Sequence, residues 1–248
     1  MRAYFFSTCI GAGVFADTAI NAIKLLQNEG IEVIFKKDQT CCGQISYNSG
    51  YDNETRQVAL HNVNLFNENY PIIVLGGSCT GMMKYDYLSL FRDTKYEEMV
   101  KKFSSRVIEL SDFLHHNLKV NYEDKGNPVN VTWHSNCHAL RYAKSVTSSK
   151  ILLRMLKNVT LRELDREEEC CGFGGTFSIK EPEISNVMVS KKIQDIKNQN
   201  VEYVITSDVS CLLNISGALE KQKVNVKAVN LYDFLAERIG VLWVIIRL

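Results

Sequence analysis

The sequence predicts an α/β protein with two pseudo-duplicated βαβ-type lobes, each built on a mostly parallel sheet. Two observations support this fold class. Strand-like apolar runs alternate with stretches of helical periodicity along the 248 residues, and a pattern of four cysteines occurs once in each half of the chain. We expect the first lobe to span residues 1–124 and the second residues 125–248, because segment 121–128 is polar and carries Gly and Pro turn signals.

The cysteines give the clearest sign of duplication. Their steps are 32, 1 and 37 residues in the first half and 33, 1 and 40 in the second, for the sets Cys9, Cys41, Cys42, Cys79 and Cys137, Cys170, Cys171, Cys211. Each set contains the tripeptide Cys-Cys-Gly, which chance would place in a chain of this composition far less than once. The segments VIELSDFL and AVNLYDFL also repeat, and they put Asp112 and Asp233 at matching positions.

The order of elements in the first lobe follows from hydrophobic periodicity. The segment RAYFFSTC predicts a strand that runs into Cys9. Apolar side chains between Ala16 and Leu26 share one helical face, and Gly30 ends that helix. The rest of the lobe is predicted as a strand over Ile31–Phe35, a helix with Ala59, Val63 and Phe66 on its apolar face, and a strand over Ile72–Leu75.

The second lobe repeats this order. The segment PVNVTWHSNC predicts a strand before Cys137, Pro182 suits the first turn of a helix, and a strand over Tyr203–Thr206 runs towards Cys211. The first lobe is longer chiefly because of extra residues at about 84–104.

The cysteine spacing has a physical cause in such a fold. A strand, its crossover helix and the next parallel strand take about 30 residues or more, so each cysteine falls just past the carboxyl end of a strand. Those ends share one edge of a parallel sheet, where ligands bind in open α/β folds. We therefore expect the four cysteines of each half to converge in space.

Converging thiols point to a metal centre. Disulfides are rare in a reducing compartment, and sets of four cysteines hold iron–sulfur clusters or zinc. Neither half has the close C-x₂₋₄-C pairs of a typical structural zinc site, which favours a cluster, of the 4Fe-4S type, in each lobe and leaves zinc as the alternative in one or both. Gly172, Gly174 and Gly175 are candidates for close approach of backbone N–H groups to such a centre, or simple turn residues.

Charge and hydropathy exclude several function classes. The net charge of +1 gives no overall field for binding nucleic acid. The N-terminal residues lack the features of a secretory signal, so we expect a cytoplasmic protein. The apolar run Val241–Ile246 is too short for a transmembrane segment, and the segment Gly240–Leu248 is expected to pack on the second lobe or on a partner chain.

The motifs resemble those of the cysteine-rich CCG domain, which occurs in duplicate in the cysteine-rich subunit of heterodisulfide reductase, in the iron–sulfur subunit of glycolate oxidase and in the lactate utilisation protein A group. The last is the most similar, on SNCHALR, EECCGFGGTFSIKEPEIS and SDVSCLL. This resemblance implies a cytoplasmic electron-transfer subunit of an L-lactate-oxidising complex, with two partner iron–sulfur subunits and a respiratory, membrane-associated electron acceptor. The eight cysteines would bind the clusters.

One departure from the family pattern concerns the ligands. Heterodisulfide reductase-type domains end in a Cys-x-x-Cys pair that supplies a fifth thiolate. Here Gly76 and Met82 flank Cys79 at that spacing, and Asp208 and Asn214 flank Cys211. A four-thiolate cluster, a cluster completed by another residue or a partner, and a site emptied by oxygen all stay open, and disulfide cleavage is not carried over.

Other interpretations compete with this one. Gly11-Ala12-Gly13 opens a helix after a strand, as in a dinucleotide-binding fingerprint, but the second half has no glycine there. His134 and His138 could each be an imidazole ligand, a hydrogen-bond partner of a thiolate or an ordinary polar residue. The chain could also serve glycolate or another 2-hydroxy acid, or be a structural zinc or thiol scaffold. Because no triad, carboxylate pair or flavin motif is present, we expect a subunit of an oxidoreductase complex rather than the chain that oxidises the substrate.

Overall fold

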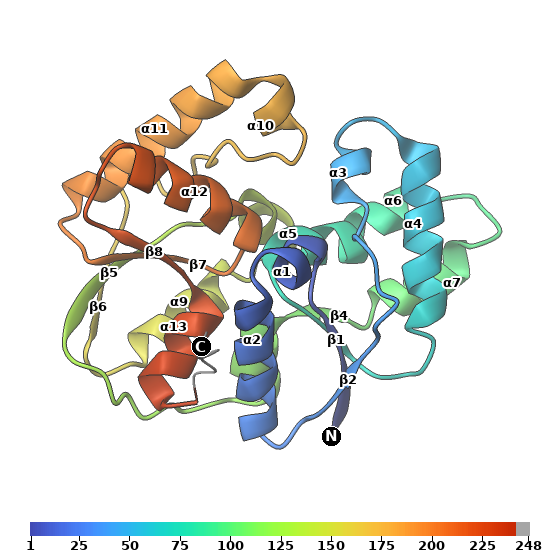
Figure 1. Ribbon diagram of the computed structural model, residues 1–248. Helices are drawn as coiled ribbons and strands as arrows, with labels where there is room; N and C mark the ends of the chain where they lie inside the picture. The colour runs from blue at the N-terminus through green and yellow to red at the C-terminus, as the bar shows by residue number, and fades with distance from the viewer. Residues whose placement is uncertain (242–248) are drawn as a thin grey trace, which may run out of the picture.

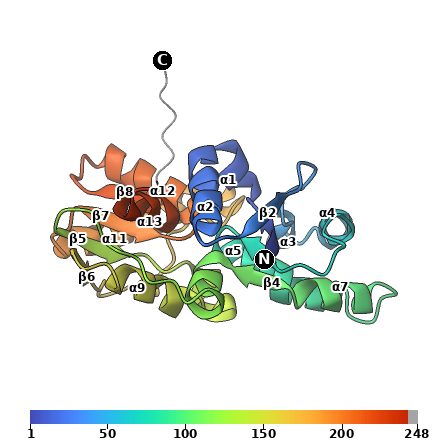
Figure 2. The same ribbon diagram turned by 90° about the horizontal axis from the view of Figure 1, so that it is seen from below.

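The computed structural model describes residues 1–241 and contains two four-stranded sheets, one in each half of the chain (Figures 1 and 2). The sequence predicts that segment Gly240–Leu248 packs on the second lobe or on a partner chain. Its residues after Val241 lie outside the described part of the chain. Within residues 1–241, no helix is both long and apolar enough to cross a lipid bilayer.

Both sheets are parallel throughout and share one strand order. The first has the order β2-β1-β3-β4, formed by β1 (Arg2–Phe6), β2 (Glu32–Phe35), β3 (Ile72–Val74) and β4 (Val107–Glu109). The second has the order β6-β5-β7-β8, formed by β5 (Val129–Trp133), β6 (Val159–Arg162), β7 (Tyr203–Thr206) and β8 (Lys227–Asn230). The prediction of two duplicated α/β lobes is confirmed.

Helices connect the strands on both faces of each sheet. Those of the first half are α1 (Cys9–Gly13), α2 (Ala16–Asn28), α3 (Gln44–Tyr47), α4 (Asp52–Leu65), α5 (Gly77–Gly81), the π-helix η1 (Met82–Asp86), α6 (Tyr87–Leu90), α7 (Glu97–Ser104), α8 (Leu110–Asp112) and η2 (Phe113–Asn117). Those of the second are η3 (Ala139–Ala143), α9 (Val146–Arg154), α10 (Phe177–Lys180), α11 (Pro182–Asn198), α12 (Val209–Lys221) and α13 (Leu231–Ile239). The extra residues of the first half form most of η1, α6 and α7.

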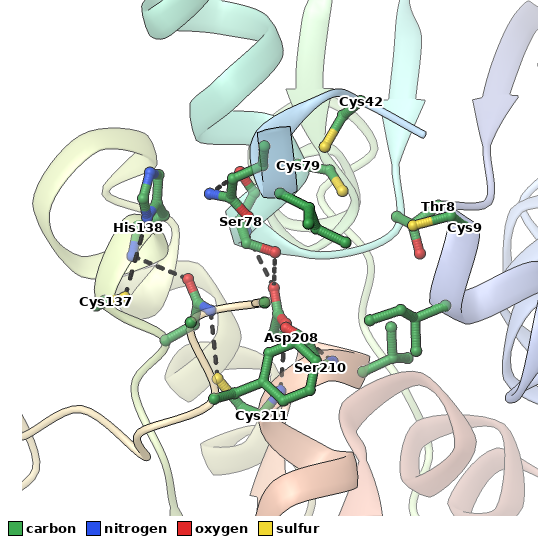
Figure 3. A pocket seen from close by; sticks show the side chains of 18 of the residues that line it. Thr8, Cys9, Cys42, Ser78, Cys79, Cys137, His138, Asp208, Ser210 and Cys211 are labelled. Atoms are coloured by element: carbon green, nitrogen blue, oxygen red, sulfur yellow. Dashed lines mark hydrogen bonds between the residues drawn. The ribbon is translucent and has the colours of Figure 1, made fainter. Parts of the chain in front are cut away.

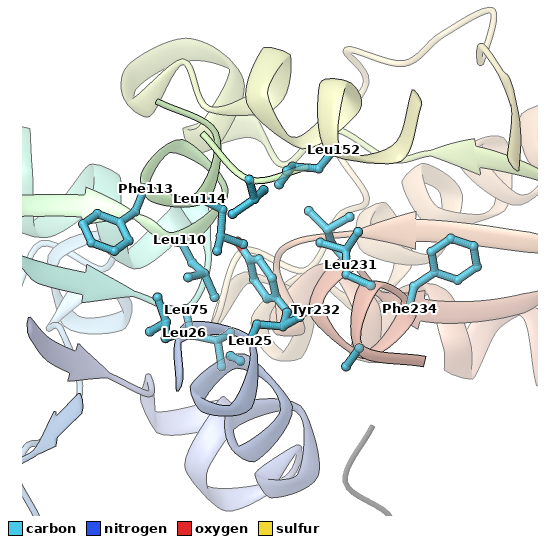
Figure 4. Close-up of a cluster of buried hydrophobic side chains, with 14 of the residues drawn as sticks. Leu25, Leu26, Leu75, Leu110, Phe113, Leu114, Leu152, Leu231, Tyr232 and Phe234 are labelled. Atoms are coloured by element: carbon cyan, nitrogen blue, oxygen red, sulfur yellow. The ribbon is translucent and has the colours of Figure 1, made fainter. Parts of the chain in front are cut away.

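The inner strands of each sheet, β1, β3, β5 and β7, are largely buried on both faces, as in other parallel sheets. In β1, Ala3 and Phe5 join one hydrophobic cluster, while Tyr4 and Phe6 join another on the opposite face. A third cluster covers the outer face of the second sheet. The first of these clusters is shared, because it contains side chains of both halves, including Leu110, Leu152 and Tyr232 (Figure 4).

The last helices of each lobe pack against the other lobe across this shared core. Helix α13 of the second lobe packs against α2 of the first, and α8 and η2 of the first lobe pack against α9 of the second. The two repeated aspartates stabilise this packing with hydrogen bonds between the lobes. Asp233 accepts from Thr18 (2.5 Å) and Asn21 (2.7 Å), and Asp112 accepts from Ser148 (2.6 Å). The two sheets are therefore held in a fixed relation to each other.

The segment between the lobes is also tied down. Asp124 accepts two hydrogen bonds from Arg238 of α13, at 2.6 and 2.7 Å, in a buried ion pair. Burial alone would raise the pKa of the Asp124 carboxyl, but the hydrogen bonds from Arg238 and from backbone N–H groups outweigh it and lower that pKa.

Candidate metal centre

All eight cysteines line one cavity between the two lobes, at the carboxyl ends of the strands (Figure 3). Cys9 follows β1, Cys41 and Cys42 follow β2, and Cys79 follows β3; Cys137, Cys170, Cys171 and Cys211 follow β5, β6 and β7 in the same way. The cysteines are all free. The expected convergence of residues distant in sequence is therefore what the structure has.

In the first lobe the thiols form a chain of contacts. The Sγ atoms of Cys9 and Cys41 lie 3.5 Å apart, too far for a disulfide, in which the sulfurs are about 2.05 Å apart. Hydrogen bonds from the thiols of Cys42 and Cys9 lower the pKa of Cys41 to about 3, and the N–H of Gly43, 3.4 Å from this sulfur, acts in the same direction. The same contacts raise the pKa of Cys9 and Cys42. The contacts of this quartet thus converge on the sulfur of Cys41.

The second lobe repeats this arrangement. Hydrogen bonds from Cys137 and Cys171 lower the pKa of Cys170 to about 2, and the N–H of Gly172 lies 3.3 Å from its sulfur. The pKa of Cys171 is raised, first by its contact with Cys170 and then by that with Cys211. Two equivalent quartets of sulfur donors therefore face one cavity.

Glycine is required where the backbone turns beneath each quartet. Gly43 and Gly172 have φ of +89° and +83°, which brings their N–H groups to the sulfurs of Cys41 and Cys170. A Cβ atom on Gly172 would lie 2.8 Å from the carbonyl oxygen of Ser185. Gly174 and Gly175 also have positive φ, at +53° and +66°. Close backbone approach to a sulfur is observed for Gly172 alone of the three glycines named from the sequence.

The residues at the Cys-x-x-Cys spacing, where the family pattern has a fifth thiolate, make other contacts in this structure. Met82 is fully buried in the hydrophobic cluster that contains Cys42 and Cys79, and Asn214 donates a 2.7 Å hydrogen bond to the carbonyl oxygen of Cys171. Asp208 caps helix α12 by accepting from the backbone N–H of Ser210. These side chains support the cysteine loops without adding a sulfur donor.

The rims of the two sites touch. The hydroxyl of Ser49 in the first lobe lies 2.8 Å from that of Thr176 in the second. Asp208 of the second lobe accepts from the backbone N–H of Ser78 at 3.0 Å (Figure 3). The two quartets therefore face each other across a space enclosed by both lobes.

The sequence left the role of His134 open between a ligand, a hydrogen-bond partner of a thiolate and an ordinary polar residue. It is 0% exposed, neither ring nitrogen has a hydrogen-bond partner among residues 1–241, and its ligand atom lies within 4.8 Å of the sulfurs of Cys171 and Cys211. Burial, with a contribution from Lys192, lowers its pKa to about 3, so the imidazole is neutral. The interpretation as an ordinary polar residue at a loop does not account for a buried imidazole without partners in the described part of the chain.

His138 has a more ordinary setting. Its Nδ1 is 3.9 Å from the sulfur of Cys137, its Nε2 is 3.6 Å from a carboxylate oxygen of Asp86, and its ring stacks on that of Tyr142. It lies at the rim of the cavity (Figure 3).

Packing accounts for Gly11, the first glycine of the motif after β1, whereas a Cβ atom on Gly13 would meet nothing within 4 Å. Gly11 lies within α1, its N–H donates to the hydroxyl of Thr8 at 3.0 Å, and a Cβ atom there would be 2.9 Å from that oxygen and 3.0 Å from Leu75. The same turn carries Cys9 into the cavity.

Comparisons with known proteins agree with this architecture. The family model for the cysteine-rich CCG domain matches residues 3–84 and 131–216. Lactate utilization protein A of Halalkalibacterium halodurans is 35% identical over 236 residues, covering 95% of this chain and 96% of that protein, and the protein of the same name from Oceanobacillus iheyensis is 36% identical with the same coverage. The crystal structure of a hypothetical protein from Helicobacter pylori has the same fold, with a TM-score of 0.68 at 9% identity over 96% of this chain; the chain spans about half (49%) of that structure. The chain, which contains the CCG cysteine-rich domain twice, therefore belongs to the lactate utilization protein A family.

Proposed function

We propose that this chain is an iron–sulfur electron-transfer subunit of an L-lactate-oxidising complex, acting in the cytoplasm with two partner subunits and a membrane-associated electron acceptor. The observation that carries the proposal is the single cavity lined by two equivalent quartets of free cysteines. The choice of lactate as the substrate of the complex rests on the relatives, which bear the name lactate utilization protein A.

The residues present fit such a centre. Thiolate sulfur is the donor that iron–sulfur clusters use, and the first centre would be held by Cys9, Cys41, Cys42 and Cys79, the second by Cys137, Cys170, Cys171 and Cys211. Backbone N–H groups at the sulfurs of Cys41 and Cys170 would stabilise negative charge there. A bound cluster supplies the capacity to accept and release single electrons.

The chain's own groups fix the geometry of the donors. Tyr87 donates to the carbonyl oxygen of Cys42 at 2.7 Å and Asn62 to that of Cys41 at 2.9 Å, so the paired cysteines keep one orientation. Cys42, Cys79, Cys171 and Cys211 are buried, which limits the access of water.

The lining of the cavity favours oxidation of lactate on a partner. A lactate carboxylate needs a cation or several N–H donors, and none of the described lining residues is Lys or Arg. The acidic residue among the described lining residues is Asp208, whose side chain would repel the carboxylate of lactate. Electron transfer rather than dehydrogenation suits this site.

Anaerobic co-purification with the partner subunits tests the proposal. L-lactate should bleach the visible absorption of the iron–sulfur centres in the complex, and glycolate should do so more slowly. Bleaching by glycolate but not by L-lactate would mean that the complex oxidises another 2-hydroxy acid. A preparation that contains iron but responds to no 2-hydroxy acid would contradict the assignment.

A structural zinc scaffold is the second candidate, because His134, Cys171 and Cys211 lie close enough together to hold a zinc ion. Zinc has no redox chemistry, so such a protein would show stoichiometric zinc, no visible absorption and no reversible redox titration. The iron–sulfur assignment instead predicts iron without stoichiometric zinc, broad visible absorption and a reversible redox titration.

A further inference from the structure

The second lobe differs from the first at one position beside its cysteines. His134 stands three residues before Cys137, and Phe6 stands three residues before Cys9, at the ends of the equivalent strands β5 and β1. Phe6 is fully buried in the hydrophobic cluster that also contains Cys42 and Cys79. The fold thus puts a phenyl ring at the first quartet and an imidazole at the second.

The imidazole is placed for ligation. It is completely buried, both ring nitrogens lack a hydrogen-bond partner among the described residues, and its ligand atom lies within 4.8 Å of the sulfurs of Cys171 and Cys211. Buried polar groups in proteins are nearly always paired, so an unpaired imidazole at a set of sulfur donors needs a partner that the described chain does not supply.

We propose that His134 is a ligand of the iron–sulfur centre in the second lobe, so that this centre has an imidazole donor and the centre of the first lobe has thiolates alone. This inference rests on the proposed function. One iron–nitrogen bond forms through the lone pair of a neutral imidazole, so no electron moves and no proton is released. His134 would then supply a fifth donor from the end of β5, whereas the family pattern takes its fifth thiolate from the Cys-x-x-Cys pair at the last cysteine.

The expected consequence is two centres with different potentials. The identity of the ligands is one of the factors that set the reduction potential of an iron–sulfur centre, so a centre with an imidazole beside its four thiolates is expected to differ in potential from one with four thiolates alone. This difference in reduction potential would give electron transfer between the two centres a preferred direction.

The test uses the full-length, cluster-loaded protein prepared anaerobically with ¹⁵N-labelled histidine and studied by pulsed EPR in its paramagnetic state. A histidine nitrogen coupled directly to the centre is expected in the unsubstituted protein. The coupling should disappear in His134→Phe and remain in the control His138→Gln, which alters the other histidine beside the cysteines. It should also remain in Cys42→Ser, which lacks the first centre.

The outcomes separate the two proposals. Centres that show no histidine coupling, or a coupling that survives His134→Phe, overturn the ligation and leave the electron-transfer function standing. A protein with no iron and no acid-labile sulfide, or with zinc instead, overturns both. Phenylalanine already fits the equivalent position in the first lobe, and the labelling experiment on the unsubstituted chain needs no variant to fold.

Discussion

Asp208 and Ser78 join the cysteine-bearing edges of the two lobes directly. One carboxylate oxygen of Asp208 accepts from the backbone N–H of Ser78 at 3.0 Å and also from its hydroxyl. The other oxygen accepts from the N–H groups of Ser210 (3.1 Å) and Cys211 (3.4 Å) at the start of α12. Because Ser78 precedes Cys79, a single side chain orients the last cysteine of both quartets.

Asp208→Ala should therefore weaken both sites. Loss of a helix cap and of charge-assisted hydrogen bonds is expected to lower the free energy of unfolding by about 3 kcal/mol. Iron retention should fall in both lobes, measured by metal analysis after gel filtration. Ser216→Ala, on the exposed side of the same helix, is the control, with an expected change under about 0.5 kcal/mol. Loss of iron from the second lobe alone would contradict the shared role of Asp208.

Gly172→Ala should damage the second site selectively. The residue has φ of +83°, and the new Cβ would lie 2.8 Å from a backbone oxygen, so the loop must shift away from Cys170. We expect a loss of about 2 kcal/mol in stability and about half the bound iron. Gly217→Ala is the matched control: this glycine lies within α12 with open space around it, and alanine should stabilise the helix by up to about 1 kcal/mol. Equal effects of the two substitutions would show that the turn beneath Cys170 is unimportant.

Glu109 should make the stability of the apoprotein depend on pH. This carboxyl is buried where the lobes meet and accepts hydrogen bonds from Ser111 and from Tyr232 of α13. Burial raises its pKa from 4.5 to about 7. The folded state therefore holds a proton that the unfolded state releases between these values, and the stabilising contribution present below pH 4.5 is lost as the pH rises through 7.

Glu109→Gln is expected to remove that dependence. One pKa unit corresponds to about 1.4 kcal/mol, so the stability difference between the unsubstituted protein and the variant should change by about 3 kcal/mol from about pH 4.5 to about pH 8. Urea unfolding under reducing conditions measures it, with the exposed Glu98→Gln as control. A difference that is constant over this range would mean that folding does not raise the pKa of Glu109.

The two quartets should load independently of each other. Cys42→Ser removes a buried sulfur of the first quartet and Cys171→Ser one of the second. Each variant is expected to keep about half the iron and sulfide of the unsubstituted protein, and the double variant almost none. If either single substitution abolished all the iron, one centre shared between the lobes would be the better description.

Much of the fold could be predicted from the sequence, because it depends on local periodicity. Strand Tyr203–Thr206 and the helix beginning at Pro182 have the expected bounds, and the strands expected to include Ile31 and Leu75 are each one residue shorter at that end. The position of each cysteine after a strand follows from the length of a βαβ unit, which is why the quartets could be predicted as well.

The contacts between the lobes could not be predicted in this way. The apolar face predicted between Ala16 and Leu26 takes in Ile20 and Ile23, yet both are only partly buried, whereas Ala22, Leu25 and Leu26 are fully buried because α13 of the other lobe packs on that side. Thr18 and Asn21 are buried for the same reason, as partners of Asp233. Tertiary packing between distant segments decides these positions.

His134 illustrates the same limit at the metal centre. The available signal was a histidine at the end of an apolar strand, in line with Phe6 of the other half. Its burial and its distance from Cys171 and Cys211 depend on how β5, β6 and β7 pair in one sheet.

Metal and sulfide analysis of the full-length protein, reconstituted anaerobically with iron, sulfide and competing zinc, tests the central claim most directly. The two thiol quartets predict about eight iron and about eight acid-labile sulfide atoms per chain, with broad visible absorption that bleaches reversibly on reduction. Stoichiometric zinc without iron or sulfide under the same conditions would contradict it.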